Sequence, residues 1–129
     1  MSIRHVCETH GCYIKTQTPD WGFLDSSFTN KIRVGDIDGI VEANGHLLIL
    51  EWKSFIGDIP TGQRIMFEKI TKINKIIVFV VSGDPIETVP VHIKIYSSGR
   101  LVANESCDSD KLKRYCSAWE RKARGVNNE

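Results

Sequence analysis

The sequence predicts a mixed α/β domain, and three observations support this fold class. A hairpin signal, Asn44-Gly45, joins two apolar runs, a continuous apolar run covers residues 76–81, and an amphipathic pattern occupies about 109–124. A segment with helical spacing separates the hairpin from the second apolar run. A strand, a crossover helix and a second buried strand form a βαβ unit, in which we expect parallel strands and a right-handed crossover.

Length and composition limit the class of protein. The chain has 129 residues, enough for one domain with a sizeable core but not for two. Apolar residues make up 41% and charged residues 26%, as in ordinary globular proteins. No apolar run approaches the ~18 residues of a membrane span and no signal-peptide pattern opens the chain, so we expect an intracellular, cytoplasmic protein without a membrane partner. The net charge of +1 neither indicates nor excludes nucleic acid.

Residues 1–30 are rich in Cys and His at first and loop-like afterwards. Pro19-Asp20 and Asp25-Ser26-Ser27 are typical breakers of regular structure, so no long helix is predicted in this segment. Trp21 and Phe23 are interpreted as core or loop anchors rather than as a platform on which nucleic-acid bases stack.

A hairpin is predicted over about 33–54. Asn44-Gly45 between two apolar runs is typical of a two-residue type I′ turn, and with these residues as the loop, residues whose numbers sum to 89 lie opposite one another. Three apolar pairs result: Ile37 with Trp52, Ile40 with Ile49, and Val41 with Leu48. Both faces are therefore apolar away from the acidic end, as expected of a central strand covered on two sides.

The charged residues of the hairpin gather at its open end. The register sets Asp38 opposite Glu51 and Asp36 opposite Lys53. Cβ atoms of opposed residues lie roughly 5 Å apart, and like charges at that distance are destabilising, so the Asp38–Glu51 pair requires a cation. Acidic groups at the end of a buried strand are also costly unless they are paired or liganded. The open end of the hairpin is therefore predicted to be a metal site.

Downstream of the hairpin, Thr61 is predicted to cap a helix that reaches about Asn74. Its inward face is expected to carry three residues: Met66, Ile70 and Ile73. The apolar run over 76–81 is then a buried strand, ended by a turn at 82–85.

Two further strands and a helix complete the chain. Residues 89–96 alternate, with Val89, Val91, Ile93 and Ile95 on the predicted inner face. A turn over 97–99 leads into a strand at 101–103, and the final helix begins near Asp108 to Asp110. Five residues form its apolar stripe: Leu112, Tyr115, Cys116, Trp119 and Ala123. Tyr115 and Trp119 lie on this stripe, so we favour core packing over base stacking for both.

Three motifs lie within roughly residues 33–82: Asp38, the Glu51-Trp52-Lys53 triplet at a strand end, and Gly62-Gln63-Arg64 at the start of a helix. Together they resemble the PD-(D/E)XK nuclease superfamily, most closely the RecB-like and phage-type exonuclease or resolvase branch, in which a helical Gln adjoins the metal site. Gln63 with Phe67 resembles the Q-x-x-x-Y pattern of that branch, with Phe in place of Tyr.

The resemblance implies a restriction-endonuclease-like mixed sheet flanked by helices, with an αβββαβ core. Residues 1–129 would then form a single nuclease-like domain with a Cys/His-rich amino-terminal segment and a basic carboxyl-terminal helix. The implied activity is hydrolysis of DNA phosphodiesters with Mg²⁺ or Mn²⁺, in phage or mobile-element replication, recombination or repair, including in an infected host cell. DNA is the implied partner, and a homo-oligomer is compatible with it.

Chemical reasoning assigns the same residues. Glu51 and Lys53 are separated by two positions and project from one face of a strand, whereas Trp52 points away and offers its backbone carbonyl. Mg²⁺ takes six oxygens and usually only one or two carboxylates, so Asp38, Glu51 and the Trp52 carbonyl form an incomplete shell that leaves room for water and phosphate. Lys53 orients or deprotonates the attacking water, or stabilises the pentavalent state, and the sequence does not choose between these roles.

Three more residues have candidate roles at this site. Asp36 is either a second metal ligand or a partner that supports Lys53, and its register opposite Lys53 favours support. Glu8 is the only early candidate for the carboxylate that many superfamily members contribute from an amino-terminal helix. Gln63 is expected to orient a ligand or contact phosphate.

Basic residues are candidates for contacts with nucleic-acid phosphates, which position a duplex without reading its sequence. One lies beside Gln63 and four lie on the final helix: Arg64, Lys113, Arg114, Arg121 and Lys122.

A Cys/His cluster near the amino terminus is a second candidate metal site. Cys7, His10 and Cys12 supply three of the four ligands of a structural zinc ion. The fourth ligand has three candidates: Cys107, Cys116 and His92. The spacing is not one of the strong zinc patterns, so we favour reduced thiols and keep structural Zn²⁺ as the alternative.

Two other functions stay open at this point. One is a catalytically inactive nucleic-acid-binding module on the same fold, and the other is a zinc-stabilised protein-interaction module. The first predicts DNA binding without cleavage in Mn²⁺, and the second predicts bound zinc and indifference to changes at Lys53.

Overall fold

The computed structural model describes residues 19–126, which divide between two units that meet at Asp36 and Ile37. The first unit contains a short 3₁₀ helix, η1 (Trp21–Ser27), which begins after Asp20. The Asp20 carboxylate accepts a hydrogen bond of 2.8 Å from the Gly22 N–H, and the Trp21 and Phe23 rings stack with centroids 6.5 Å apart. The prediction of plain loop here was wrong, because Asp20 caps a helical turn that extends through Ser27.

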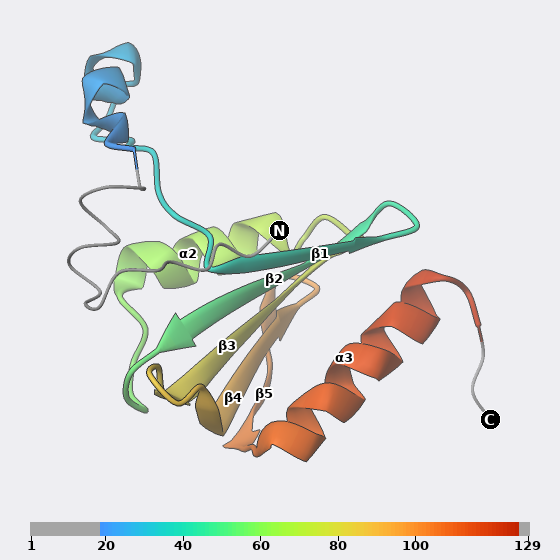
Figure 1. The fold of residues 1–129 in the computed structure, drawn as a ribbon. Coiled ribbons are helices and arrows are strands. Elements are labelled where there is room, and N and C mark those ends of the chain that lie inside the picture. Colours follow the sequence, from blue (N-terminus) through green and yellow to red (C-terminus); the bar gives the residue numbers. More distant parts are fainter. Residues whose placement is uncertain (1–18, 127–129) are drawn as a thin grey trace. The chain divides into compact units, whose positions relative to one another are not determined.

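The second unit is a five-stranded mixed sheet with helices on both faces (Figure 1). Its elements are β1 (Gly39–Ala43), β2 (His46–Lys53), α2 (Thr61–Ile70), β3 (Ile76–Asp84), β4 (Val89–Ser97), β5 (Arg100–Ser106) and α3 (Ser109–Ala123). The strand order is β1-β2-β3-β4-β5; β2 and β3 are parallel, and the other neighbours are antiparallel. The mixed α/β class and the parallel β2-α2-β3 unit are therefore confirmed. In the described residues two strands precede α2, where an αβββαβ core has three.

The hairpin register is confirmed from its turn to Gly39, which pairs with Leu50. Asn44 and Gly45 have φ angles of 52° and 80°, the two positive values that a type I′ turn requires. The ladder stops at Gly39, so the predicted strand pairs of Asp36 with Lys53 and of Ile37 with Trp52 do not belong to it. Beyond Gly39 the Asp38 carboxylate accepts the Trp52 N–H at 2.7 Å, and a side chain thus takes over from the ladder.

The prediction of a strand covered on two sides holds for β2 but is wrong for β1. Strand β1 lies at the sheet edge, and Ile40 and Val41 remain exposed there. In β2, Leu48 and Ile49 are buried on opposite faces. The reason is position in the sheet, because a strand with neighbours on both sides lies beneath the helices and an edge strand lies beyond them.

Helix α2 is shorter than predicted and turns a different face inward. It ends at Ile70, its N-cap is Pro60 rather than Thr61, and no side chain caps its first turn. Met66 and Ile73 are exposed, whereas Phe67 is buried against Tyr96 with ring centroids 5.5 Å apart; Ile70 packs beside them as predicted. An aromatic ring buries more apolar area than Met, and this favours the inward orientation of Phe67.

The predicted inner face of strand β4 is only partly correct. Ile93 is buried and Ile95 packs against the core, but Val89 and Val91 are exposed and Pro90 and Tyr96 are buried. The register of β3 against β4 shifts between Ser82 and Gly83. A bulge of this kind changes which side chains point inward, and such a shift is not visible in the alternation of the sequence.

Helix α3 matches its prediction closely. It begins after Asp108, whose carboxylate accepts the Lys111 N–H at 2.8 Å, and it ends at Ala123. The whole predicted stripe packs against the sheet, with Trp119 and Ala123 buried. No helix in residues 19–126 is long and apolar enough to cross a membrane.

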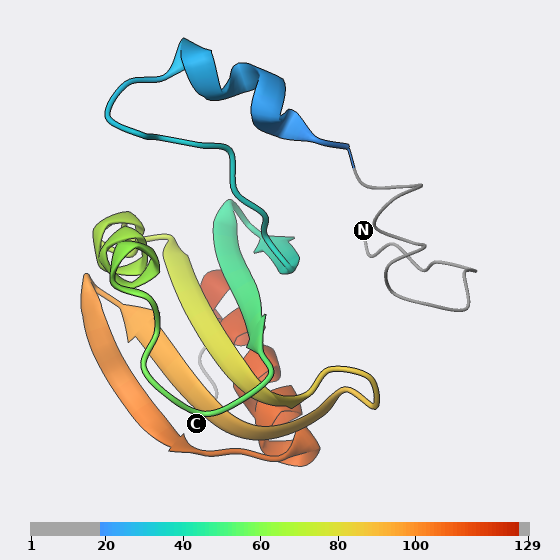
Figure 2. The same ribbon diagram turned by 90° about the vertical axis from the view of Figure 1, so that its left-hand side faces the viewer.

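The core consists of two clusters separated by the sheet. The cluster between α3 and the sheet includes Leu48, Phe79, Val81 and Ile93 from the strands and Trp119 from the helix. Under α2 lie Ile49, Phe67, Val78, Val80 and Tyr96. Figure 2 shows α2 end-on at one side of the sheet and α3 on the other side, behind β2 and β3. Because side chains alternate along a strand, Glu51 and Lys53 share the α2 face with Ile49.

Candidate active site

Glu51 is the centre of the candidate site, at the end of β2 and beneath the first turn of α2. Only 12% of its side chain is exposed. Its Oε2 accepts a hydrogen bond of 2.7 Å from Gln63 Nε2 and lies 3.6 Å from Lys53 Nζ. Both contacts fall on the same oxygen. Within residues 19–126 the other oxygen, Oε1, has no hydrogen bond or ion pair and is therefore left for a bound ligand.

The electrostatics of the site disfavour the Glu51 carboxylate. Burial and the neighbouring charge of Asp38 raise the pKa of Glu51 above its ordinary value of 4.5, while Gln63 and Lys53 act in the opposite direction. Burial is the larger of the two raising causes. The net upward shift means that Lys53 and Gln63 do not fully compensate burial and the charge of Asp38, so a cation beside Glu51 would favour its ionised form.

Asp38 lies near enough to Glu51 for its charge to raise the pKa of Glu51, although the two residues are not paired in the ladder. Asp38 follows the last paired residue and holds the Trp52 N–H through Oδ2. The Trp52 indole lies on the other face, packs against the α3 cluster and donates a 3.1 Å hydrogen bond to the Gly83 carbonyl. This anchored residue connects Asp38 to the core. The role of the Trp52 carbonyl as a metal ligand stays a prediction.

Gln63 contacts Glu51 directly and has one unused group. Its Oε1 is buried and has no hydrogen-bond partner in residues 19–126. The amide orientation follows from the contact itself, because an ionised Glu51 can only accept and Nε2 must therefore face it. A buried acceptor without a donor costs free energy, so this oxygen is suited to a bound water or another incoming donor.

The donor set fits a hard, oxygen-preferring cation. Two carboxylates and a buried amide oxygen belong to one small cluster, and Mg²⁺ or Mn²⁺ would complete its shell with water and phosphate. Over residues 19–126 no group of three or more His, Cys, Asp or Glu side chains is arranged to hold a metal. The candidate site has only two carboxylates, and it therefore differs from the closed set of four ligands that holds structural zinc.

The other predicted residues are dispersed. Asp36 belongs to the first unit, so its choice between metal ligand and support of Lys53 stays a prediction. Arg64 pairs with Glu68 along α2 at 3.0 Å. Four basic candidates lie on α3, across the sheet from Glu51: Lys113, Arg114, Arg121 and Lys122. The structure therefore does not bring these four to the candidate site.

The zinc hypothesis falls largely outside the described residues. Glu8, Cys7, His10 and Cys12 all lie before residue 19. The candidates for a fourth ligand are described: Cys107 is buried, Cys116 is partly buried, and His92 Nε2 lies 2.5 Å from Asn104 Oδ1. Burial raises the pKa of both thiols in the metal-free protein.

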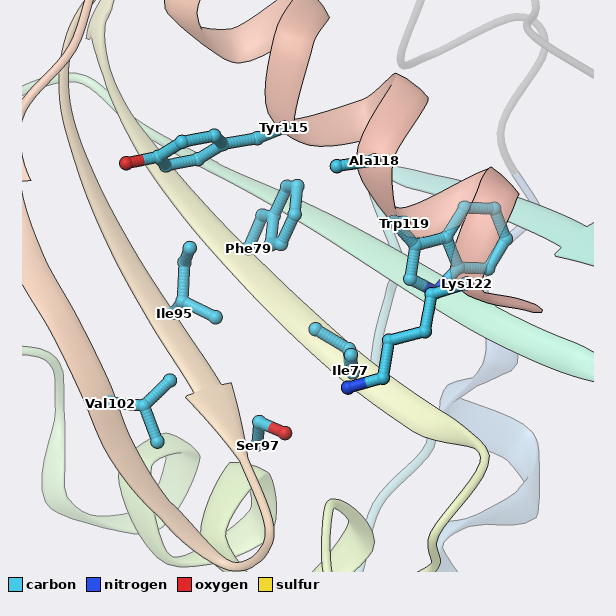
Figure 3. A pocket seen from close by; sticks show the side chains of 9 residues that line it. All are labelled: Ile77, Phe79, Ile95, Ser97, Val102, Tyr115, Ala118, Trp119 and Lys122. Atoms are coloured by element: carbon cyan, nitrogen blue, oxygen red, sulfur yellow. The ribbon is translucent and has the colours of Figure 1, made fainter. Parts of the chain in front are cut away.

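A cavity of about 290 Å³ lies away from this site, between α3 and the sheet. Figure 3 shows Phe79 between Tyr115 and Trp119 on its wall, with the Lys122 amine extending past Ile77. Its lining is almost wholly apolar, and no carboxylate contributes to it. This cavity therefore offers packing space under α3 but no acid or metal chemistry.

Sequence reasoning predicted a loop between β2 and α2 but missed how this loop is anchored. Lys94, on β4, donates a 2.6 Å hydrogen bond to the Gly57 carbonyl and fixes this loop over the sheet. The register also places the buried Ser82 beside Lys53. The alternation of Lys94 with apolar residues in β4 indicated its face, but only the strand order shows which loop it reaches.

No protein-family model matches the chain, and neither the curated proteins nor the solved structures contain a match. The geometry around Glu51 and the resemblance of the motifs are therefore the two supports for a function.

Proposed function

We propose that this protein is a divalent-metal-dependent nuclease that hydrolyses DNA phosphodiester bonds. The observation that carries the proposal is the Glu51 carboxylate, which is partly buried, with 12% of the side chain exposed. Gln63 contacts it at 2.7 Å and Lys53 at 3.6 Å, and burial followed by the charge of Asp38 raises its pKa. All three motifs of the PD-(D/E)XK-like pattern are therefore represented around the Glu51 carboxylate. A solvated surface pair would need neither the burial nor the helical amide.

The fold supports the same proposal. The hairpin, the crossover helix and the parallel strand β3 cover residues 39–84 and correspond to the part of the chain where the resemblance lies. Glu51 and Lys53 stand at the carboxyl end of an inner strand, with Gln63 on the following helix. We infer a restriction-endonuclease-like version of the mixed sheet, whose strands β4 and β5 extend it on the far side.

Asp38 and Glu51 are the residues that would hold Mg²⁺ or Mn²⁺, with the Trp52 carbonyl as a third candidate ligand. When bound, such an ion makes a water more acidic and offsets charge on the phosphate oxygens during in-line attack. Gln63 fixes the Glu51 carboxylate through Nε2 and leaves Oε1 to accept a hydrogen bond from a water. This positioning limits the reorganisation that the reaction would otherwise require.

Lys53 has the geometry to act on the substrate itself. Its amine lies 3.6 Å from Glu51 and 28% of its side chain is exposed, so it can contact a phosphate oxygen without leaving the acidic residue. The ammonium stabilises the negative charge that accumulates as the phosphate becomes pentavalent. Its position near Glu51 also allows it to orient the attacking water.

Cleavage of circular and linear DNA by wild type, Lys53→Met and Lys75→Met tests this function. Lys75 is a matched control because it lies at the opposite end of the parallel strands, just before β3. With Mg²⁺ or Mn²⁺ we expect cleavage by wild type and Lys75→Met, and a loss of about 10²- to 10³-fold in Lys53→Met, comparable to the removal of one charge-stabilising donor.

Three outcomes would contradict the proposal. Equal rates for Lys53→Met and wild type would remove Lys53 from the reaction. DNA binding without cleavage in Mn²⁺ would indicate an inactive binding module instead. Bound zinc together with indifference to Lys53→Met would indicate the zinc-stabilised interaction module. Cleavage of the circle would in addition identify an endonuclease.

A further inference from the structure

A single aromatic side chain is strongly exposed beside the candidate active site. Phe55 lies two residues after Lys53, and 74% of it is accessible to solvent. Its neighbour Ile56 is exposed as well. Large apolar side chains scattered singly over a surface need no explanation, but two adjacent ones next to a partly buried carboxylate form a local contact surface.

The loop that carries Phe55 is held in place. The Gly57 carbonyl accepts the 2.6 Å hydrogen bond from Lys94, and Ile59 packs into the cluster under α2. Figure 2 shows this loop leaving β2 and passing in front of the sheet before it reaches α2. A methyl group placed on Gly57 would lie 3.7 Å from the Phe55 ring, so the ring rests against the anchored part of the loop.

We propose that Phe55 stacks on an unpaired base of the nucleic-acid substrate, next to the phosphate that Lys53 contacts. This inference rests on the proposed nuclease function. Two residues of extended chain span at most about 7 Å, and successive bases of one strand rise about 3.4 Å, so the backbones of Lys53 and Phe55 are separated by no more than about two base steps. An exposed ring offers the π face that bases use for stacking, whereas a paired duplex presents no free base face.

The substrate that follows is DNA with unpaired nucleotides beside the cleaved bond, such as a fork or a frayed end. Phe55 acts here as a specificity residue, because it favours one DNA structure without contacting the reacting phosphate. Ile56 adds apolar area beside the ring but lacks a flat face. The hydrogen bond from Lys94 to the Gly57 carbonyl limits movement of the loop that carries Phe55, which lowers the entropy lost on binding.

Binding of labelled DNA, measured by fluorescence anisotropy in Ca²⁺, tests the proposal by comparing a forked duplex with a fully paired duplex. Cleavage of both DNAs is measured separately in Mg²⁺. The variants are Phe55→Ala, Phe55→Trp and Ile73→Ala. Ile73 is an exposed apolar residue beyond the carboxyl end of α2, far along the parallel strands from Lys53, and serves as the control. Phe55→Trp keeps an aromatic face.

We expect wild type to bind the fork more tightly than the duplex by roughly tenfold, the size of one base–aromatic stacking contact. Phe55→Ala should lose this preference, and Phe55→Trp and Ile73→Ala should keep it. Equal fork preference in Phe55→Ala and wild type would overturn the stacking proposal, even if both proteins cleave DNA. Absence of cleavage by wild type, with a Phe55-dependent fork preference retained, would overturn the nuclease function but support the stacking contact.

Discussion

On one face of the sheet, α3 runs for 15 residues, begins at a side-chain cap and packs its whole apolar stripe against the strands. On the other face, α2 runs for 10 residues, has no side-chain cap, and buries mainly Phe67. The α3 face is further fastened by Tyr115, whose hydroxyl contacts Glu105, and by Lys111, whose amine lies 2.8 Å from the same carboxylate.

The difference in coverage explains where the charged residues lie. A long helix covers the α3 face with apolar contacts, whereas the short α2 leaves the carboxyl end of β2 to a loop and to polar groups. Partial burial therefore raises the pKa of Glu51, while the exposed 12% of its side chain is still open to a ligand. The comparison suggests that the α3 face provides most of the stability and the α2 face provides the candidate chemistry.

The largest expected effect is a loss of stability on the α3 face. Trp119→Ala removes a buried indole that contacts the core and borders the cavity under α3. Such a truncation costs about 3–5 kcal/mol of unfolding free energy, because it enlarges a space that the sheet cannot close. Urea unfolding measures the change, with exposed Ile73→Ala as control. Unchanged stability would show that α3 contributes little to the free energy of unfolding. Loss of cleavage in a variant that is still folded would show that the α3 face also affects the activity assigned to the α2 face.

The second effect concerns metal binding on the α2 face. Mg²⁺ at 100 times its dissociation constant should stabilise wild type by about 2.7 kcal/mol, because the ion binds only the folded protein. Glu51→Gln keeps the contact with Gln63 but lacks the charge, and should lose this stabilisation. Thermal unfolding with and without Mg²⁺ measures it. Glu105→Gln is the matched control on the other face, and an equal response of the two variants would argue against a site at Glu51.

Much of this fold was readable from the sequence because its determinants are local. Asn44-Gly45 has the conformation that its turn type requires, and the apolar run over 76–81 lies in β3, whose buried residues are 78–83. The strand continues to Asp84, so the turn predicted over 82–85 begins later than expected. The stripe of α3 was correct because helical periodicity continues through the whole element. In each case, neighbours within a few residues were sufficient.

The rest depends on contacts between distant segments. The sequence could not show that β1 lies at an edge, that the bulge at Ser82 and Gly83 changes the faces of β4, or that Phe67 displaces Met66 from the core. At the candidate site, the motif identified Glu51 and its neighbours. The anchoring of Gly57 by Lys94 was missed, because it joins residues 37 positions apart.

A smaller effect tests how α2 is fastened. Thr71 is buried at the end of α2, where its hydroxyl donates to the Phe67 carbonyl at 2.7 Å and accepts the Gly99 N–H at 3.2 Å. Thr71→Val keeps the shape but leaves the Gly99 N–H without its acceptor, at a cost of about 1–3 kcal/mol, whereas the Phe67 carbonyl keeps the backbone N–H of residue 71 at 3.2 Å. Tyr115→Phe is the counterpart on the α3 face and should cost about 1 kcal/mol, since its lost contact is partly exposed. Equal losses would mean that the two helices are fastened alike.

The smallest effect is the pH dependence of two glutamates on opposite faces. Hydrogen bonds from Lys111 and Tyr115 lower the pKa of Glu105, whereas burial and then Asp38 raise the pKa of Glu51 in the metal-free protein. A lowered pKa adds stability above the unfolded value of 4.5, and this contribution is lost as pH falls through the folded pKa. A raised pKa gives the opposite sign, with stability lost as pH rises from 4.5 through the folded pKa.

Replacement of each glutamate by Gln separates these two slopes. Relative to wild type, Glu105→Gln should lose most stability at neutral pH and approach wild type in acid. Glu51→Gln should gain relative to wild type as pH rises above 4.5. Thermal unfolding from acid to neutral pH, without divalent metal, gives both difference curves. Slopes of the same sign would mean that Glu51 is stabilised as an anion by the protein alone, and the argument that this face requires a bound cation would then fail.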